Sequence, residues 1–207
     1  MGNCGGGDAD RRTGSSLNIR GGNNGKGGPN SRTKSSECKV LMLGDAYVGK
    51  TSVTMRYAKN EFKEGYNNTI GAQFQQPRIT LKNGNILKLN LWDTAGEEKF
   101  RSMISMYYKE AKGVVIVYDI GRRETFENVK NWLVTLSEHI KMEDAILYLV
   151  GNKKDLSPSE KRVEAEMAKT FAQSNGMRFG EVSAKTGDGI KEVFNTLAED
   201  LSKKFGY

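Results

Sequence analysis

The sequence is poor in cysteine, histidine and long apolar runs, and each shortage excludes a class of protein. Cys4 and Cys38 are the only cysteines among 207 residues, and there is a single histidine. Two cysteines cannot build a disulfide framework or a zinc site, so we expect a reducing compartment. No apolar run reaches the roughly 18 residues of a membrane-spanning helix, and the polar, glycine-rich start is unlike a secretory signal.

The charge of the chain is unbalanced, with 32 Lys and Arg against 25 Asp and Glu and a net charge of +7. This balance suits a nucleic acid or an anionic membrane surface, although surplus surface lysines produce the same excess. No basic stretch is interleaved with aromatic residues, so we do not expect nucleic acid as a partner.

Residues 1–36 differ in composition from the rest of the chain. They contain ten of the 24 glycines, six Lys and Arg against two Asp, and only scattered apolar residues. A segment of this kind buries too little apolar surface to offset the entropy of ordering it. We therefore predict a disordered, basic, glycine-rich tail at 1–36 and a folded domain at 37–207.

Within the domain, apolar runs of strand length alternate with stretches of helical periodicity. Residues 126–140, 160–174 and 190–201 have the helical spacing, whereas Asn83-Gly84 between two β-like runs predicts a tight hairpin. The runs GVVIVYD and AILYLVGN are continuously apolar, which is typical of parallel strands buried on both faces. This order predicts an α/β fold, a doubly wound sheet that binds its ligand beyond the carboxyl ends of the strands.

The stretch GDAYVGKT at 44–51 lies between an apolar strand and a helix and has the spacing G-x-x-x-x-G-K-T. Gly44 and Gly49 allow the backbone to turn its N–H groups toward phosphate oxygens. The Lys50 ammonium reaches the β and γ phosphates, and the Thr51 hydroxyl is a ligand for Mg²⁺. The stretch therefore predicts a nucleoside-triphosphate site. Four more loop residues contribute their N–H groups: Asp45, Ala46, Tyr47 and Val48.

Two later loops indicate which base is bound. In NKKD, Asp155 can accept from the guanine N1–H and N2–H₂, a donor pair that adenine does not offer. Asn152 can tie loops together, and the stem of Lys153 can cover the ring. In SAKTG, the N–H groups of Ala184 and Lys185 can face the guanine O6. N-K-x-D alone is a weak signal, but three such loops at successive strand ends predict a guanine nucleotide.

Together these motifs resemble a Ras-superfamily small GTPase of the Rab family, from about residue 38 to residue 204. TIGAQF at 69–74 and WDTAGEEKF at 92–100 belong to the resemblance, and TIGAQF, MYY and VYDI are most similar to the early-endosomal Rab branch. The resemblance implies a P-loop small G domain, with a six-stranded, mostly parallel sheet and helices on both faces. It also implies GTP and GDP as ligands, Mg²⁺ as cofactor, and a monomer. Exchange factors, GTPase-activating proteins and effectors would bind its two switch segments, about 62–75 and 93–108.

The resemblance also implies roles for individual residues. Thr69 closes over Mg²⁺ and the γ-phosphate, and Asp93 holds Mg²⁺ through water. The Gly96 N–H contacts the γ-phosphate, and Phe62 lies edge-on to guanine. The implied metal ligands are Thr51, Thr69 and Asp93. The implied nucleotide-binding residues are Asp45, Ala46, Tyr47, Val48, Gly49, Lys50, Thr51, Ser52, Phe62, Thr69, Gly96, Asn152, Lys153, Asp155, Ser183, Ala184 and Lys185.

An aromatic set is implied as the surface that effectors recognise. Phe74, Trp92 and Tyr107 align with the aromatic triad of Rab proteins, and Ile70 lies beside them in the first switch segment. Ordinary core packing explains the three aromatic residues equally well.

Glu97 stands where the Rab pattern has the glutamine that positions the attacking water. With Lys50 it forms the predicted catalytic pair. A carboxylate keeps the acceptor, loses the amide donor, and adds negative charge beside an anionic transition state. We expect slow intrinsic hydrolysis that an activating protein restores. The alternative is a GTP-binding scaffold with little or no hydrolysis.

The start MGNCGGG predicts lipid attachment. Gly2 is an acceptor for myristate once Met1 is removed, although position 6 is Gly and not Ser or Thr. One myristoyl chain binds membranes weakly, so palmitate on Cys4 and the basic tail would supply the second signal. This layout resembles N-terminally acylated plant and protist Rabs, and the end KKFGY has no cysteine for prenylation. We expect the cytoplasmic face of endosomal or other vesicular membranes, with an unmodified tail as the alternative.

Overall fold

The computed structural model describes Met1 and residues 33–65, 69, 71–95 and 107–207. The first strand, β1, begins at Ser35, so Ser35 and Ser36 belong to the sheet and not to the tail assigned from composition. Their backbones pair in parallel with residues 86 and 87 of a neighbouring strand, a contact that local composition does not reveal. The predicted disorder of 2–32 lies outside the described residues.

The helices and strands alternate along the domain as predicted. In chain order they are β1 (Ser35–Leu43), α1 (Lys50–Lys59), β2 (Ala72–Gln75), β3 (Arg78–Thr80), β4 (Ile86–Thr94), β5 (Gly113–Asp119), α3 (Arg123–Glu127), α4 (Val129–Ser137), a 3₁₀ helix (Met142–Asp144), β6 (Ile146–Asn152), α5 (Ala165–Ser174), β7 (Arg178–Glu181) and α6 (Ile190–Phe205).

One sheet runs through the domain in the order β2-β4-β1-β5-β6-β7, and β3 also pairs with β4. The pairs β1–β4, β1–β5, β5–β6 and β6–β7 are parallel, whereas β2 and β3 are antiparallel to β4. The described sheet has seven strands in six positions, where six strands were expected. β2 and β3 share one edge position because Pro77, which has no N–H to donate, separates them. The hairpin at Asn83-Gly84 joins β3 to β4, with the Gly84 N–H bound to the Leu81 carbonyl.

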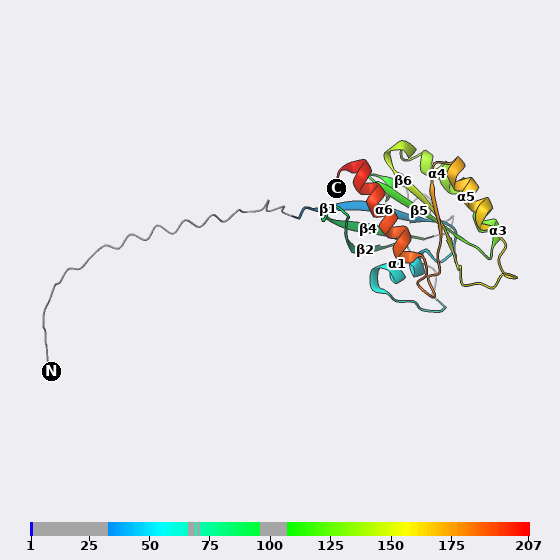
Figure 1. The fold of residues 1–207 in the computed structure, drawn as a ribbon, viewed down its shortest axis with the longest axis horizontal. Helices are drawn as coiled ribbons and strands as arrows, with labels where there is room; N and C mark the ends of the chain where they lie inside the picture. The colour runs from blue at the N-terminus through cyan, green and yellow to red at the C-terminus, as the bar shows by residue number, and fades with distance from the viewer. Residues whose placement is uncertain (2–32, 66–68, 70, 96–106) are drawn as a thin grey trace, which may run out of the picture. The chain divides into compact units, whose positions relative to one another are not determined.

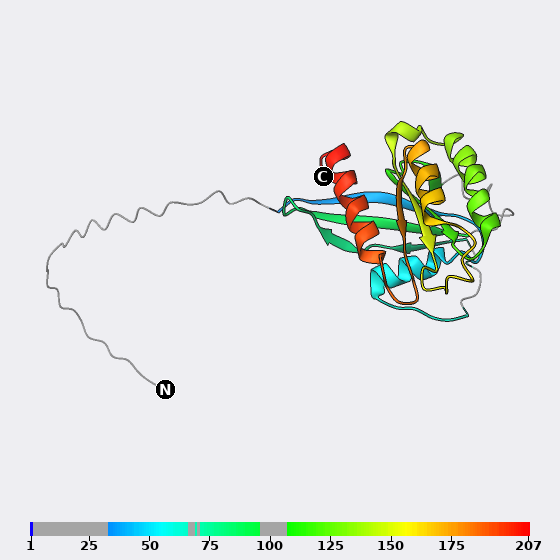
Figure 2. The ribbon, with the colours of Figure 1, turned by 45° about the vertical axis from the view of Figure 1, so that its right-hand side comes forward.

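Helices cover both faces of the sheet (Figures 1 and 2). On β1, Cys38, Val40 and Met42 point into one core cluster with α1 and α6. Leu41 and Leu43 point into the other cluster, which includes residues of α3, α4 and α5. This alternation follows from the two-residue period of a strand and confirms the predicted two-sided burial. Burial also raises the pKa of Cys38 to about 11, which fits a packing role.

Two predicted helical stretches are shorter in the structure. The stretch 160–174 becomes helical only at Ala165, because the N–H groups of Arg162 and Val163 bind the Ile120 carbonyl instead of a helical one. The stretch 126–140 divides into α3 and α4 and ends at Ser137, so His139 is an exposed residue after the helix. None of the helices that the structure describes is long and apolar enough to cross a membrane.

Candidate functional site

The loop 44–49 joins β1 to α1 at the carboxyl end of the parallel strands, where the two glycines have no room for a side chain. A Cβ on Gly44 would lie 2.1 Å from the Val117 carbonyl oxygen, and one on Gly49 would lie 2.4 Å from the Asn152 Nδ2. Both also have positive φ, which glycine adopts without strain. The loop therefore packs tightly against β5 and β6 while turning back toward its own helix.

Lys50 is the first residue of α1 and lies under the loop. Its Nζ donates to the carbonyls of Gly44 and Asp45, each at 2.9 Å, and only 6% of the residue is exposed. An ammonium has three N–H donors, so these two bonds leave one for a ligand. Burial lowers the pKa of Lys50 to about 8, although the nearby carboxylates of Asp93 and Asp45 oppose the shift.

The three residues expected at the metal converge beside Lys50. The Thr51 hydroxyl donates to Asp93 Oδ2 at 2.5 Å and lies 2.7 Å from the Thr69 hydroxyl. Thr51 has one proton and gives it to Asp93, so Thr69 is the donor in the second bond. Thr51 and Asp93 are 8% and 1% exposed, so α1 and β4 hold these oxygens in a buried position.

Asp93, together with two neighbouring hydroxyl groups, offers the oxygen ligands that a magnesium ion would use. Its Oδ1 is buried and has no hydrogen-bond partner in the part of the chain that the structure describes. Burial raises the pKa of Asp93 to about 6, although the Thr51 hydroxyl and the Lys50 charge act in the opposite direction. Among the described residues no cluster of three or more His, Cys, Asp or Glu could hold a metal. One carboxylate with two hydroxyls fits Mg²⁺, which keeps several waters and uses one or two carboxylates together with phosphate oxygens.

Asn152, at the end of β6, connects the phosphate loop to the base-binding loops. Its Nδ2 donates to the Val48 carbonyl at 2.9 Å, and its Oδ1 accepts from the Ala184 N–H at 3.1 Å. Asp155 is exposed, and its Oδ1 accepts from the Ser183 hydroxyl at 2.5 Å. The structure thus brings these residues together, but the Ala184 N–H, which was expected to face the guanine O6, donates to Asn152.

A cavity of about 390 Å³ lies between these loops and the end of α1. Its walls include residues predicted to bind nucleotide, together with a short stretch after Phe62 that the sequence placed in the first switch segment and not among the nucleotide-binding residues. The lining residues are Tyr47, Gly49, Ser52, Phe62, Lys63, Glu64, Gly65, Asn152, Lys153, Asp155, Ala184 and Lys185. A cleft of this size and position fits a base and ribose.

Arg56 is a site residue that sequence reasoning missed. Its Nε and one terminal nitrogen donate to the carbonyls of Ala184 and Lys185, each at 2.8 Å. Its guanidinium carbon lies 5.9 Å from the centre of the Phe62 ring. Arg56 therefore holds the peptide group between Ala184 and Lys185, whose N–H was assigned to guanine, and the carbonyl of the next peptide group. An isolated arginine near the end of a helix carries no sequence signal for such a contact.

Two further contacts hold the outer side of the phosphate loop. Asp45 Oδ1 accepts from the Trp132 indole at 2.8 Å and from Asn128 Nδ2 at 2.6 Å, which ties the loop to α4. The Ala46 carbonyl accepts from Arg122 at 3.0 Å. Both contacts join residues more than 70 positions apart, and the sequence motifs give no indication of either.

The aromatic residues expected at an effector surface lie together. The ring centres of Phe74 and Trp92 are 5.2 Å apart, and those of Trp92 and Tyr107 are also 5.2 Å apart. Phe74 is 46% exposed, and the other two are half-buried. The row is therefore accessible from solvent and is not part of the fully buried core.

Several predicted functional residues lie outside the described residues. They are the lipid acceptors Gly2 and Cys4, the switch residues Ile70 and Gly96, and the catalytic candidate Glu97. Their assignments stay predictions from the sequence.

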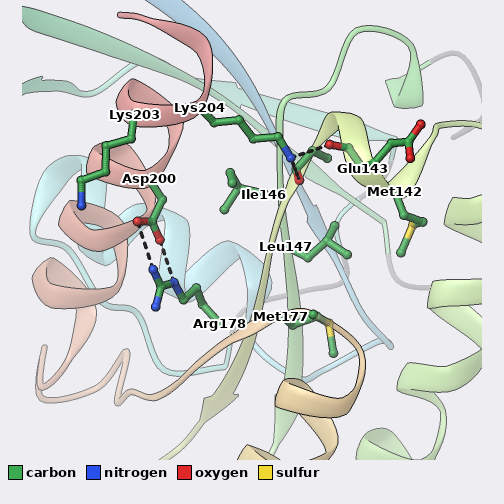
Figure 3. Close-up of a pocket in the computed structure, with 11 residues that line it drawn as sticks. Met142, Glu143, Ile146, Leu147, Met177, Arg178, Asp200, Lys203 and Lys204 are labelled. Atoms are coloured by element: carbon green, nitrogen blue, oxygen red, sulfur yellow. Dashed lines mark hydrogen bonds and ion pairs between the residues drawn. The ribbon is translucent and has the colours of Figure 1, made fainter.

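A second cavity, about 660 Å³, lies at the opposite, amino-terminal ends of β6 and β7 (Figure 3). Three of its charged side chains, those of Arg178, Asp200 and Lys204, bind other groups of the protein. Arg178 makes two bonds to Asp200, at 2.8 and 3.2 Å, and Lys204 donates to the carbonyls of Glu143 and Ala145. None of the residues that line this larger cavity was predicted to bind nucleotide or metal, so volume alone does not identify the functional site.

Comparisons with known proteins agree with this geometry. A family model described as "Ras family" matches residues 39–203. The chain is 39% identical over 189 residues to the GTP-binding protein YPT52 of Saccharomyces cerevisiae, covering 79% of this chain and 81% of the relative. It is 42% identical over 163 residues to the Ras-related protein RABA3 of Arabidopsis thaliana, covering 79% of this chain and 68% of the relative.

Proposed function

This chain belongs to the Ras family of small GTPases and is of the Rab type, and on that premise we propose that it is a switch controlled by Mg²⁺ and GTP in vesicle traffic. The observation that carries the proposal is the convergence of Thr51, Thr69 and Asp93 beside Lys50, with one buried Asp93 oxygen left open. Bound Mg²⁺ would neutralise charge on the phosphate oxygens. Lys50 would orient the phosphates through its remaining N–H donor.

The state of the nucleotide would be reported through the two switch segments. Thr69 belongs to the first segment, and its hydroxyl contacts Thr51 on α1, which in turn donates to Asp93 on β4. The Ala95 N–H donates to the Gly71 carbonyl at 2.9 Å, which links the start of the second segment to the first. A γ-phosphate that engages Thr69 would therefore influence both segments.

Base selection supports guanine over adenine. Asp155 offers carboxylate oxygens to the cavity, and the Ser183 hydroxyl holds one of them. A carboxylate placed for two N–H donors is left without partners by adenine.

Hydrolysis would be slow because Glu97 replaces glutamine. Even with glutamine, the intrinsic rate of a Ras-type GTPase is only about 10⁻⁴ s⁻¹. A barrier higher by about 1.4 kcal/mol would lower this rate about tenfold. The test is single-turnover GTP hydrolysis by the native chain and by Glu97→Gln. A faster Glu97→Gln supports the proposal, and an unchanged rate shows that Glu97 is not limiting.

A second function has one specific observation in its favour, which is the same Glu97. A chain that binds GTP and does not hydrolyse it would act as an interaction scaffold. Adding a Rab-type activating protein to the single-turnover reaction separates the two functions. A large acceleration supports the switch, because such a protein can supply arginine and glutamine in trans, whereas no acceleration supports the scaffold.

Membrane attachment through Gly2 and Cys4 is the remaining part of the proposal. Gly2→Ala should make the protein cytosolic, and Cys4→Ser should leave it weakly and reversibly attached, because one acyl chain is marginal and two are stable. Fractionation of cells that express the tagged variants measures this. A Gly2→Ala protein that still sediments with membranes would point to a protein receptor.

A further inference from the structure

Arg122 connects two loops of the site that no sequence motif joins. It follows β5, and its Nε donates to Asp119 Oδ2 at 3.1 Å while a terminal nitrogen donates to the Ala46 carbonyl at 3.0 Å. The planar guanidinium presents its donors in a fixed fork, so one side chain can hold both acceptors together. Arg122 thus fixes the Ala46 carbonyl relative to the end of β5.

Asp119 makes this arrangement rigid. Its side chain is only 3% exposed, and Oδ2 also receives Lys153 Nζ at 2.6 Å, while Oδ1 accepts from the Gly121 N–H at 2.9 Å. Removing one partner from a buried carboxylate is strongly destabilising, so Asp119 favours the position in which Arg122 contacts it. The Arg122 guanidinium is therefore held between the Asp119 carboxylate and the Ala46 carbonyl. The same carboxylate anchors Lys153 of the base-binding motif.

The peptide group between Ala46 and Tyr47 is the part of the phosphate loop that needs this support. Tyr47 has a φ of 64°, a left-handed conformation that is unfavourable for a bulky aromatic residue. Its side chain is 64% exposed, so little packing compensates for the strain. Rotating the 46–47 peptide plane changes ψ of Ala46 and φ of Tyr47 together, and a flip would return Tyr47 to negative φ.

A flip would also move a phosphate-binding donor. In a trans peptide the C=O and N–H point in opposite directions, so an Ala46 carbonyl held by Arg122 directs the Tyr47 N–H to the other side. Within the described part of the chain, the Tyr47 N–H donates to no protein acceptor. That direction suits a donor of the phosphate cradle, which is built from loop N–H groups.

We propose that Arg122, anchored on Asp119, is a positioning residue that locks the Ala46–Tyr47 peptide in its phosphate-binding orientation and thereby slows nucleotide release. The inference rests on the proposed guanine-nucleotide function. Because Arg122 also shares Asp119 with Lys153, the lock joins the phosphate loop to the base-binding motif. A partner that withdrew Arg122 would loosen both.

The test measures release of a fluorescent GDP from the full chain after addition of excess GDP. Arg122→Ala should release GDP at least about tenfold faster than the native protein, which corresponds to about 1.4 kcal/mol. Arg123→Ala is the matched control, because its neighbouring guanidinium is exposed and, among the described residues, pairs with Glu127 alone, at 2.9 Å. Arg122→Lys keeps the positive charge beside Asp119 but cannot bind both acceptors as the guanidinium does, so it should release GDP at an intermediate rate. If Arg122→Ala does not fold, Arg122→Lys replaces it in the comparison with Arg123→Ala.

A double-mutant cycle separates the lock from a general structural role. Tyr47→Gly removes the left-handed strain, so adding Arg122→Ala to it should accelerate release less than about threefold. Equal accelerations in the two backgrounds, or equal rates for Arg122→Ala and Arg123→Ala, would overturn the lock alone. A native protein that does not bind GDP would overturn the proposed function and the lock with it.

Discussion

The phosphate half of the site (44–51, Thr69 and Asp93) and its base half (Phe62, 152–155 and 183–186) differ in the exposure of the charged side chains assigned to the ligand. In the phosphate half the ligand-binding groups are themselves buried, with Lys50 6% and Asp93 1% exposed. In the base half, Asp155 and Lys185 are exposed.

The two halves also differ in the contacts that hold their ligand-binding groups in position. Buried side chains of the phosphate half hold one another, as the bonds among Thr51, Thr69 and Asp93 show. In the base half, the Ser183 hydroxyl holds Asp155, and Arg56 and Asn152 bind backbone groups of Ala184 and Lys185. We therefore expect damage in the phosphate half to weaken all nucleotides, and damage in the base half to weaken selectivity first.

The largest effect is expected from Thr51→Asn. The amide is bulkier than the hydroxyl between Asp93 and Thr69, so the metal ligands separate and Mg²⁺-GTP should bind about 100-fold more weakly, for a loss of about 3 kcal/mol. Titration with a fluorescent GTP analogue, with Mg²⁺ and with EDTA, measures this. The two proteins should become similar in EDTA. A Thr51→Asn protein with native affinity in Mg²⁺ would show that Thr51 is not a metal ligand.

Asp155→Asn is expected to change selectivity more than stability. One acceptor for the guanine N–H groups becomes a donor, so the preference for GTP over ATP should fall about tenfold or more. Competition between the two nucleotides for the labelled site provides the measurement. Asp188→Asn is the control, since this exposed carboxylate pairs with Lys154 at 2.8 Å and lies outside the cavity lining. Equal losses in both variants would contradict the assignment.

Arg56→Ala should have a smaller effect on the same half. Each bond to a loop carbonyl contributes on the order of 1 kcal/mol, so GTP affinity should fall about five- to thirtyfold. Lys59→Ala, an exposed position one turn further along α1, is the matched control and should match the native protein. If Arg56→Ala binds GTP with the same affinity as Lys59→Ala, the base half does not depend on the bonds from Arg56 to the Ala184 and Lys185 carbonyls.

The smallest effect is expected at the second cavity. Lys203→Ala should change GTP affinity less than about twofold, because this cavity lies at the other end of the strands and its ion pair is internal. The same titration measures it. A large loss would mean that the two ends of the sheet are coupled, and the comparison between the two halves would then be incomplete.

Motifs that are continuous in sequence predicted much of the site. GDAYVGKT and NKKD are each continuous stretches at the carboxyl end of a strand, so the positions of Lys50, Thr51 and Asn152 follow from strand order and the chemistry of these stretches. The continuous apolar runs likewise predicted β5 and β6, because strands buried on both faces need such runs.

Contacts between distant residues were not predictable in this way. Arg56, Arg122 and Asp119 act through bonds to backbone or buried groups far along the chain, and an arginine on a helix or loop resembles any solvated surface residue. The start of α5 was misplaced for a similar reason, because Ile120 takes the N–H groups that a helix would have used.

The interruption of the sheet edge at Pro77 has a consequence for solubility. An exposed edge strand is a template for pairing with another chain, and long flat edges promote aggregation. Here one outer edge consists of four residues in β2 and three in β3 with a proline between them, and the other edge is the four-residue β7, which begins with Arg178. Over the described strands, neither edge offers a long uninterrupted row of free backbone groups, so we expect little growth of the sheet from one molecule into the next at high concentration.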